Sequence, residues 1–138
     1  MTLEYSPADG STAGQLDIAL PPHSSELPAL RATITEWLRS NRDDRDVVDG
    51  AVLAASEMTH LAMEHGAGEH PVVLHLRRTH SILVIEVTLQ YEGDAQDVLA
   101  GLEPSTAPME VQIIEHFADR LVAEASGGAV TMRSTFHY

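Results

Sequence analysis

The sequence contains no cysteine among its 138 residues, and this absence excludes disulfide bonds, thiolate metal sites and thiol nucleophiles. Basic residues are scarce as well, because 8 Lys and Arg stand against 21 Asp and Glu and leave a formal net charge of -13 at pH 7. A surface this acidic repels phosphate backbones and anionic lipid headgroups. We therefore expect no nucleic acid and no membrane surface among the partners.

Long hydrophobic runs are also missing. The longest apolar stretches, such as residues 82–87, fall far short of the roughly 20 residues that span a bilayer. Residues 1–14 lack the basic stretch and apolar run of a signal peptide, so we expect a cytoplasmic location. Hydrophobic residues make up 43% and charged residues 21% of the chain, which is ordinary for a globular protein. We expect a flexible N-terminal segment over residues 1–14 and a single domain over residues 15–138.

Apolar residues at helical spacing predict three helices. The first follows a possible cap at Ser24 or Ser25, and its buried face consists of Leu27, Leu30, Ile34, Trp37 and Leu38. The second runs from residue 43 or 44 to residue 65 and has a broad apolar stripe whose small alanines indicate close packing. The third covers about residues 109–123 and places on one side Val111, Ile114, Ala118, Leu121 and Val122.

Strand patterns separate these helices. We predict strands at residues 16–20, 72–76, 82–89 and 129–136, of which the middle two form an antiparallel hairpin. Residues 90–108 have few apolar anchors beyond one possible helical turn at Val98, Leu99 and Leu102, so this segment is predicted to be mobile. The order of these strands and helices along the chain predicts an α+β two-layer sandwich, in which helices cover one face of a mixed or antiparallel sheet.

Three local runs resemble one family. Residues 52–65, Val-Leu-Ala-Ala-Ser-Glu-Met-Thr-His-Leu-Ala-Met-Glu-His, carry a Ser-Glu pair and a final His on one helix. Residues 113–121 belong to the predicted third helix, and Gly127-Gly128-Ala129-Val130 leads into the last strand. This arrangement is similar to the small ATP-binding serine kinases of the bacterial anti-sigma factor type, relatives of histidine-kinase ATPase domains. The resemblance covers roughly residues 16–136 and implies the histidine kinase-like ATPase fold.

The resemblance assigns a role to two residues of the long helix. Glu57 stands where the family has the general base that activates the attacking hydroxyl. Leu61 stands where the family has an Asn that holds magnesium, and an aliphatic side chain offers no oxygen to a cation that requires oxygen ligands. Phosphoryl transfer without that ion loses its main charge neutralisation.

Two further family motifs are also altered. Leu89 and Tyr91 replace the Asp and Gly of the adenine-binding Asp-x-Gly motif, which removes the base acceptor and obstructs its slot. An alternative register uses Asp94 with Gly93. Pro108 and Glu110 replace the glycines of the phosphate-binding Gly-x-Gly motif; Pro108 has no N–H, and Glu110 places a negative charge where phosphate would bind.

These changes predict a non-catalytic, anti-sigma-factor-like regulatory protein that has lost ATP binding, uses no cofactor and binds no metal. The resemblance implies that it acts by partner switching, with a sigma factor or an anti-sigma antagonist as the protein partner. It also implies a possible homodimer formed near the first strand and helix. Because the chain is so acidic, the partner's contact region is expected to be basic.

Two alternatives remain open. The first is an active ATP-dependent serine/threonine protein kinase with a remodelled nucleotide site, in which Glu57 is retained as the base. The second is a metal-dependent enzyme centred on Glu57 and His60, since Glu57, His60 and Glu64 share one helix face at i, i+3 and i+7. The simpler interpretation of these three residues is an exposed polar stripe.

Overall fold

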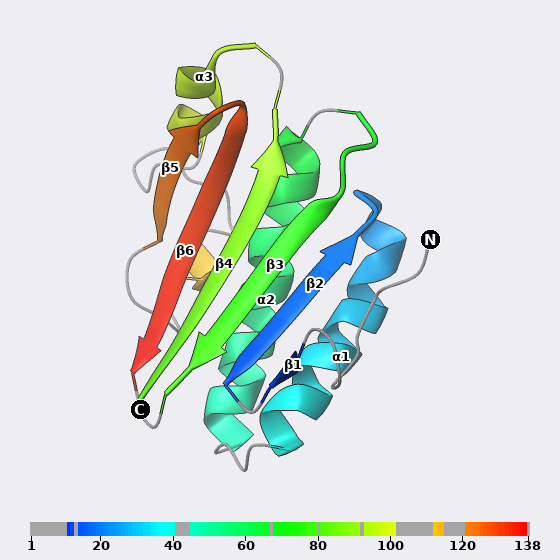
Figure 1. The fold of residues 1–138 in the computed structure, drawn as a ribbon, viewed down its shortest axis with the longest axis vertical. Helices are drawn as coiled ribbons and strands as arrows, with labels where there is room; N and C mark the ends of the chain where they lie inside the picture. The colour runs from blue at the N-terminus through cyan, green and yellow to red at the C-terminus, as the bar shows by residue number, and fades with distance from the viewer. Residues whose placement is uncertain are drawn as a thin grey trace.

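The computed structural model describes residues 11–12, 14–40, 45–66, 68–79, 81–91, 93–101, 112–114 and 121–137. Within these ranges the chain forms one sheet and a layer of helices (Figure 1). The elements in chain order are β1 (Ser11–Thr12), β2 (Gln15–Leu20), a 3-10 turn (Ser24–Glu26), α1 (Leu27–Ser40), α2 (Arg45–His65), β3 (Val72–Arg78), β4 (Ile82–Gln90), α3 (Ala95–Gly101), β5 (Val122–Ser126) and β6 (Ala129–His137).

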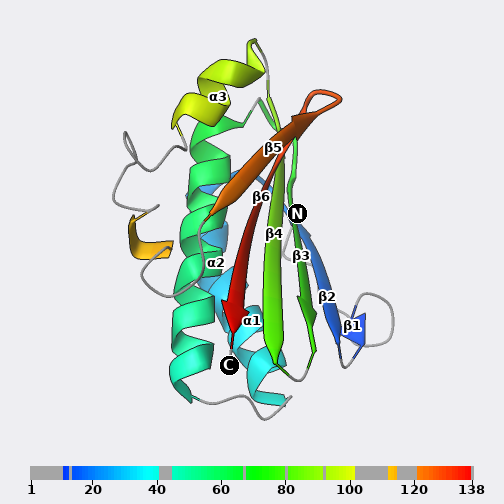
Figure 2. The same ribbon diagram turned by 90° about the vertical axis from the view of Figure 1, so that its left-hand side faces the viewer.

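The sheet has the strand order β1-β2-β3-β4-β6-β5, and every neighbouring pair of strands in it is antiparallel. Helices α1 and α2 lie against one face of the sheet, and in the described part of the chain no helix covers the other face (Figure 2). The predicted α+β two-layer fold is therefore confirmed, with the antiparallel form of the sheet. None of the described helices is long and apolar enough to cross a membrane.

The core lies between the sheet and the helices. Each long strand alternates buried and more exposed residues. In β4 every second residue, from Leu83 to Leu89, is buried, and the residues between them are more exposed. One side of every such strand therefore faces the helices. The helices contribute their apolar stripes, and burial of each Leu or Ile side chain stabilises the fold by roughly 1.5 to 3 kcal/mol. The largest fully buried side chains are Trp37, Leu16, Ile18, Leu20, Leu30, Ile34, Leu38, Met58, Leu61, Leu74, Leu76 and Leu83.

The predicted end of the third helix is wrong. Residues 121–123 are not helical, because Val122 and Ala123 begin strand β5. The cause is the turn that follows: Gly127 and Gly128 have φ values of 60° and 84°, which permit a two-residue hairpin that pairs β5 with β6. Residues 112–114 are helical, whereas the remaining parts of the predicted helix, residues 109–111 and 115–120, lie outside the described residues.

Two shorter elements also differ from the expectations. Helix α3 spans seven residues, although a single turn near Val98 was predicted, and it begins where the Asp94 carboxylate accepts a hydrogen bond from the Gln96 N–H at 2.9 Å. Within residues 1–14, Ser11–Thr12 pairs with β2. Residues 1–10 and residues 102–108, the last part of the segment 90–108 that was predicted to be mobile, lie outside the described residues.

Adjacent residues of β3 provide a test of this layered arrangement. Leu74 is fully buried, whereas Val73 is 42% exposed on the other face of the sheet. We expect Leu74→Ala to lower the free energy of unfolding by about 2 to 5 kcal/mol, and Val73→Ala by about 1 kcal/mol or less. Urea denaturation followed by circular dichroism measures both values. Equal effects of the two substitutions would contradict the assigned burial.

Candidate functional site

The long helix α2 presents a polar stripe on its outer side. Glu57 and His60 are half-buried, and Glu64 is exposed one turn later. His60 Nε2 lies 3.3 Å from Glu64 Oε1, an i,i+4 pair that is charged only when the imidazole is protonated. The Glu57 carboxylate makes no hydrogen bond or ion pair with another side chain in the described ranges. The three residues therefore share a face, as the sequence predicted, but the paired residues are His60 and Glu64.

The side of α2 next to this stripe carries two buried hydroxyl groups. The Ser56 hydroxyl, whose residue is 4% exposed, accepts a hydrogen bond of 3.0 Å from Arg31 Nη1 of α1. The Thr59 hydroxyl donates at 2.7 Å to the Ala55 carbonyl within the helix. The Ser of the Ser-Glu pair thus links the two helices, and the bond to Arg31 fixes the turn of α2 on which Glu57 lies.

Leu61 and Leu89 belong to the same buried apolar cluster. Leu61 on α2 is 0% exposed and Leu89 near the end of β4 is 1% exposed. In strand register Leu89 lies opposite Val130 of β6, which is also buried. Both leucines therefore contribute packing between helix and sheet, and neither presents a polar atom to a ligand.

Tyr91 follows directly after β4, beside the end of α2. Its ring is half-buried against the apolar cluster, and its backbone N–H donates to the Gly128 carbonyl at 3.2 Å. Gly66, just past the end of α2, lies close to two backbone carbonyls, since a Cβ added there would lie 2.9 Å from the Ala62 oxygen and 3.6 Å from the Gln90 oxygen. The ends of α2 and β4 are thus in backbone contact.

Gly93 and Asp94, the alternative residues for the adenine motif, already have structural roles. Gly93 has a φ of 88°, as a turn glycine does, and Asp94 uses its carboxylate to cap α3. Pro108 and Glu110, the two altered positions of the phosphate motif, lie outside the described residues.

Within the described part of the chain, no group of three His, Cys, Asp or Glu side chains converges, so Glu57 and His60 find no third metal ligand there.

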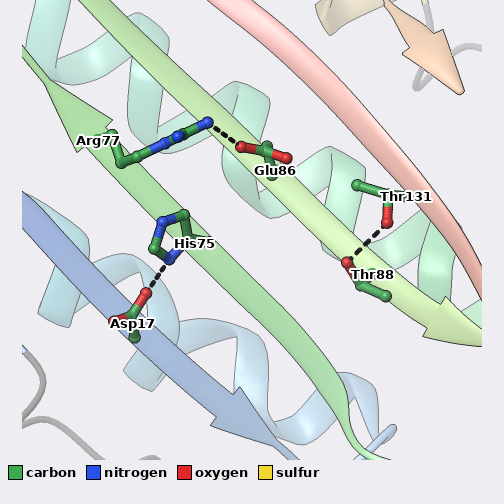
Figure 3. Close-up of polar contacts among 6 residues, drawn as sticks. All are labelled: Asp17, His75, Arg77, Glu86, Thr88 and Thr131. Carbon is green, nitrogen blue, oxygen red and sulfur yellow. Dashed lines mark hydrogen bonds and ion pairs between the residues drawn. The ribbon is translucent and has the colours of Figure 1, made fainter.

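The other face of the sheet carries polar pairs that sequence reasoning missed. Asp17 forms an ion pair with His75, Arg77 pairs with Glu86, and the Thr88 and Thr131 hydroxyls lie 3.0 Å apart (Figure 3). These residues occur at alternate positions of their strands, as the period-two pattern requires. That pattern gives the face of each side chain, but the strand register that makes them neighbours is visible only in the structure.

Comparison with known proteins gives a match among solved structures. No protein-family profile and no curated protein matches the sequence. The fold is similar to a crystal structure of the RsbU and RsbW domains of Rv1364c from Mycobacterium tuberculosis, with a TM-score of 0.68 and 19% identity over 89% of this chain. The chain corresponds to 32% of that longer protein. At this identity the likeness shows the fold alone, and it is consistent with the fold that the sequence resemblance implied.

The burial of Leu61 can be tested with two substitutions at that residue. We expect Leu61→Asn to lower the free energy of unfolding by about 3 to 5 kcal/mol, because it places an amide in an apolar core. The control Leu61→Met keeps the volume and should cost less than about 1.5 kcal/mol. Denaturant titration of both variants decides the matter: equal stabilities would mean that this side chain faces an open cleft.

Proposed function

We propose that this chain is a non-catalytic regulatory protein, similar to anti-sigma factors, that acts by binding other proteins and has lost ATP binding. The fold supports the comparison with an anti-sigma factor kinase domain. The observation that carries the loss of ATP binding is the burial of Leu61 and Leu89 in the core. These residues occupy the positions where the resemblance expects a magnesium ligand and an adenine acceptor, and an aliphatic side chain supplies neither.

The partner surface in this proposal is the acidic end of the helical layer. The end of α2 and helix α3 lie at the same end of the molecule (Figure 2). Exposed carboxylates gather on these segments, with Glu64 and Glu69 at and after the end of α2 and Asp94 and Asp97 at the start of α3. A basic region of a sigma factor or of an anti-sigma antagonist complements this surface. Partner switching then follows if two such proteins compete for it.

A kinase with a remodelled site is the alternative. It is favoured by Glu57, whose half-buried carboxylate has no partner among the described side chains and is therefore available as a general base. The two functions make opposite predictions about nucleotide binding. In the proposed function Glu57 has no catalytic role and is a polar residue on the surface of the helix.

Calorimetric titration with ATP and magnesium separates the two functions. We expect no binding heat at ligand concentrations up to the millimolar range, because the described core offers neither a magnesium ligand at Leu61 nor a base acceptor at Leu89. Micromolar binding would refute the proposed function. If phosphoryl transfer to a protein is also observed, its loss in Glu57→Gln, with ATP affinity unchanged, would assign the base and establish the kinase.

Partner binding can be tested through its charge dependence. Proteins captured from native lysate and identified by mass give the candidate partner, whose association rate with the purified chain is then measured by surface plasmon resonance. We expect the rate to fall about tenfold between low and high salt, because complementary charges accelerate encounter and salt screens them.

Two double variants with the same change in charge locate the surface. Glu64→Gln with Asp97→Asn removes two carboxylates from the helical side and should slow association several-fold. Asp17→Asn with Glu124→Gln removes two from the sheet and should leave the rate within about twofold. If the second pair slows association more than the first, the partner does not bind the acidic end of the helical layer.

A further inference from the structure

Strand β5 forms one edge of the sheet. It pairs with β6 along all of its residues, Val122–Ser126, and no strand in the described part of the chain pairs with its other side (Figure 1). Soluble proteins commonly protect such an edge with lysine, proline or a β-bulge. Strand β5 contains neither lysine nor proline, and its register with β6 runs without a bulge. Within the described chain its outer edge is therefore open to a further strand.

One hydrogen bond fixes the direction of the backbone groups in this hairpin. The Gly128 carbonyl accepts from the Tyr91 N–H at 3.2 Å, so the backbone of Gly128 faces the β4 side. Backbone groups of successive strand residues point to opposite sides, and the residues of β6 that face β5 are accordingly Ala129, Thr131 and Arg133. Their partners in β5 are Ser126, Glu124 and Val122. The N–H and C=O groups of Ala123 and Ala125 therefore point away from β6, toward the outer edge.

The side chains of β5 differ between the two faces of the sheet. Glu124 and Val122 lie on the face that no described helix covers, and Val122 is 41% exposed. Ala123 lies on the helical side, opposite the buried Met132, and packs against the core cluster. Ala125 shares this side, and α3 lies next to the strand. An added strand would thus meet a carboxylate on one face and small apolar side chains on the other.

We propose that the outer edge of β5 binds an extended segment of another protein as an added strand. The N–H and C=O groups of Ala123 and Ala125 form the main-chain hydrogen bonds, as in other complexes made by β-strand addition. A basic residue of the segment lies opposite Glu124, because opposite charges on paired strands attract and the chain carries a net charge of -13. The residues on either side of it are apolar and lie opposite Ala123 and Ala125.

This site goes beyond the proposed function. It uses the backbone of an edge strand, whereas the partner surface proposed above uses the carboxylates at the acidic end of the helical layer. The contact is also short, since only two residues of β5 direct backbone groups outward. We therefore expect a weak complex, with a dissociation constant of about 0.1 to 1 mM for an isolated segment.

The charge of Glu124 favours another protein over a second copy of this chain. If two β5 edges paired antiparallel, with Ala123 of each copy opposite Ala125 of the other, Glu124 would lie opposite Glu124. Like charges directly opposite each other on paired strands are destabilising, and the net charge of -13 on each copy adds to the repulsion. A basic segment replaces this repulsion with an attraction.

A synthetic peptide tests the edge without nucleotide or a captured partner, so the result does not depend on the proposed function. The peptide Lys-Thr-Val-Lys-Val-Thr-Lys, with both ends blocked, reads the same in either direction and can place its central lysine opposite Glu124. Amide hydrogen exchange of the full chain is followed by NMR as the peptide is added up to about 5 mM. We expect exchange of the Ala123 and Ala125 N–H groups to slow about fivefold or more. The Glu124 N–H already faces β6, so its exchange should change less than about twofold.

Proline substitutions at the two edges of the sheet provide matched variants. Ala125→Pro removes an N–H that points outward and leaves the hydrogen bonds to β6 in place, so it should raise the dissociation constant of the peptide about fivefold or more. At the other edge, the Gly14 carbonyl accepts from the Arg78 N–H at 2.9 Å, so by the same alternation the Ala19 N–H also points outward. Ala19→Pro should leave the dissociation constant within about twofold.

A charge exchange tests the pairing at Glu124. Glu124→Lys should weaken binding of the peptide about threefold or more. A second peptide, with glutamate in place of the central lysine, should bind this variant more tightly than it binds the wild-type chain. Thermal unfolding shows whether each variant folds, and the charge exchange gives the answer if Ala125→Pro does not.

Any of four results would overturn the proposal. The first is unchanged exchange at Ala123 and Ala125 in the presence of the peptide. The second is a larger loss of binding in Ala19→Pro than in Ala125→Pro, and the third is a charge exchange that leaves both affinities unchanged. The fourth is protection of the edge that rises with the concentration of the chain alone, because a second copy would then occupy it.

Discussion

The packing of helix α2 against the antiparallel sheet is the interaction on which the other features depend. Met58, Leu61 and Ala62 are fully buried on the sheet side of this helix. Their burial fixes the rotation of α2, which in turn directs Glu57 and Glu64 to the outer side. The same packing encloses Leu61 and Leu89 within the core, so two of the positions that the resemblance marks as altered also hold helix and sheet together.

The one-sided arrangement of helices divides the molecule into two chemically different surfaces. The helical side is rich in exposed carboxylates, and its field favours basic partners. The sheet side arranges polar groups in neighbouring pairs: Arg77 and Glu86 have charges that cancel locally, and Asp17 contacts the His75 imidazole. In the described part of the chain, exposed carboxylates therefore lie mainly on the helical side.

Much of this fold could be predicted from periodicity alone. Helices α1 and α2 and the β3–β4 hairpin have long, regular patterns, and the structure contains them close to the predicted bounds. Strand β5 was missed because its residues, Val-Ala-Glu-Ala-Ser, are mostly exposed and carry no alternation, so that pairing with β6 alone defines it. The pair of Asp17 and His75 could not be found either, since its members lie 58 residues apart and depend on strand register. The resemblance identified Leu61 and Leu89 as altered positions, and the structure places both in the core.

Because helices cover only one face of the sheet in the described part of the chain, the alternate strand positions on the other face meet solvent and not a second core. Substitutions at these positions remove little buried area, so the sequence of this face can diverge while the fold is kept.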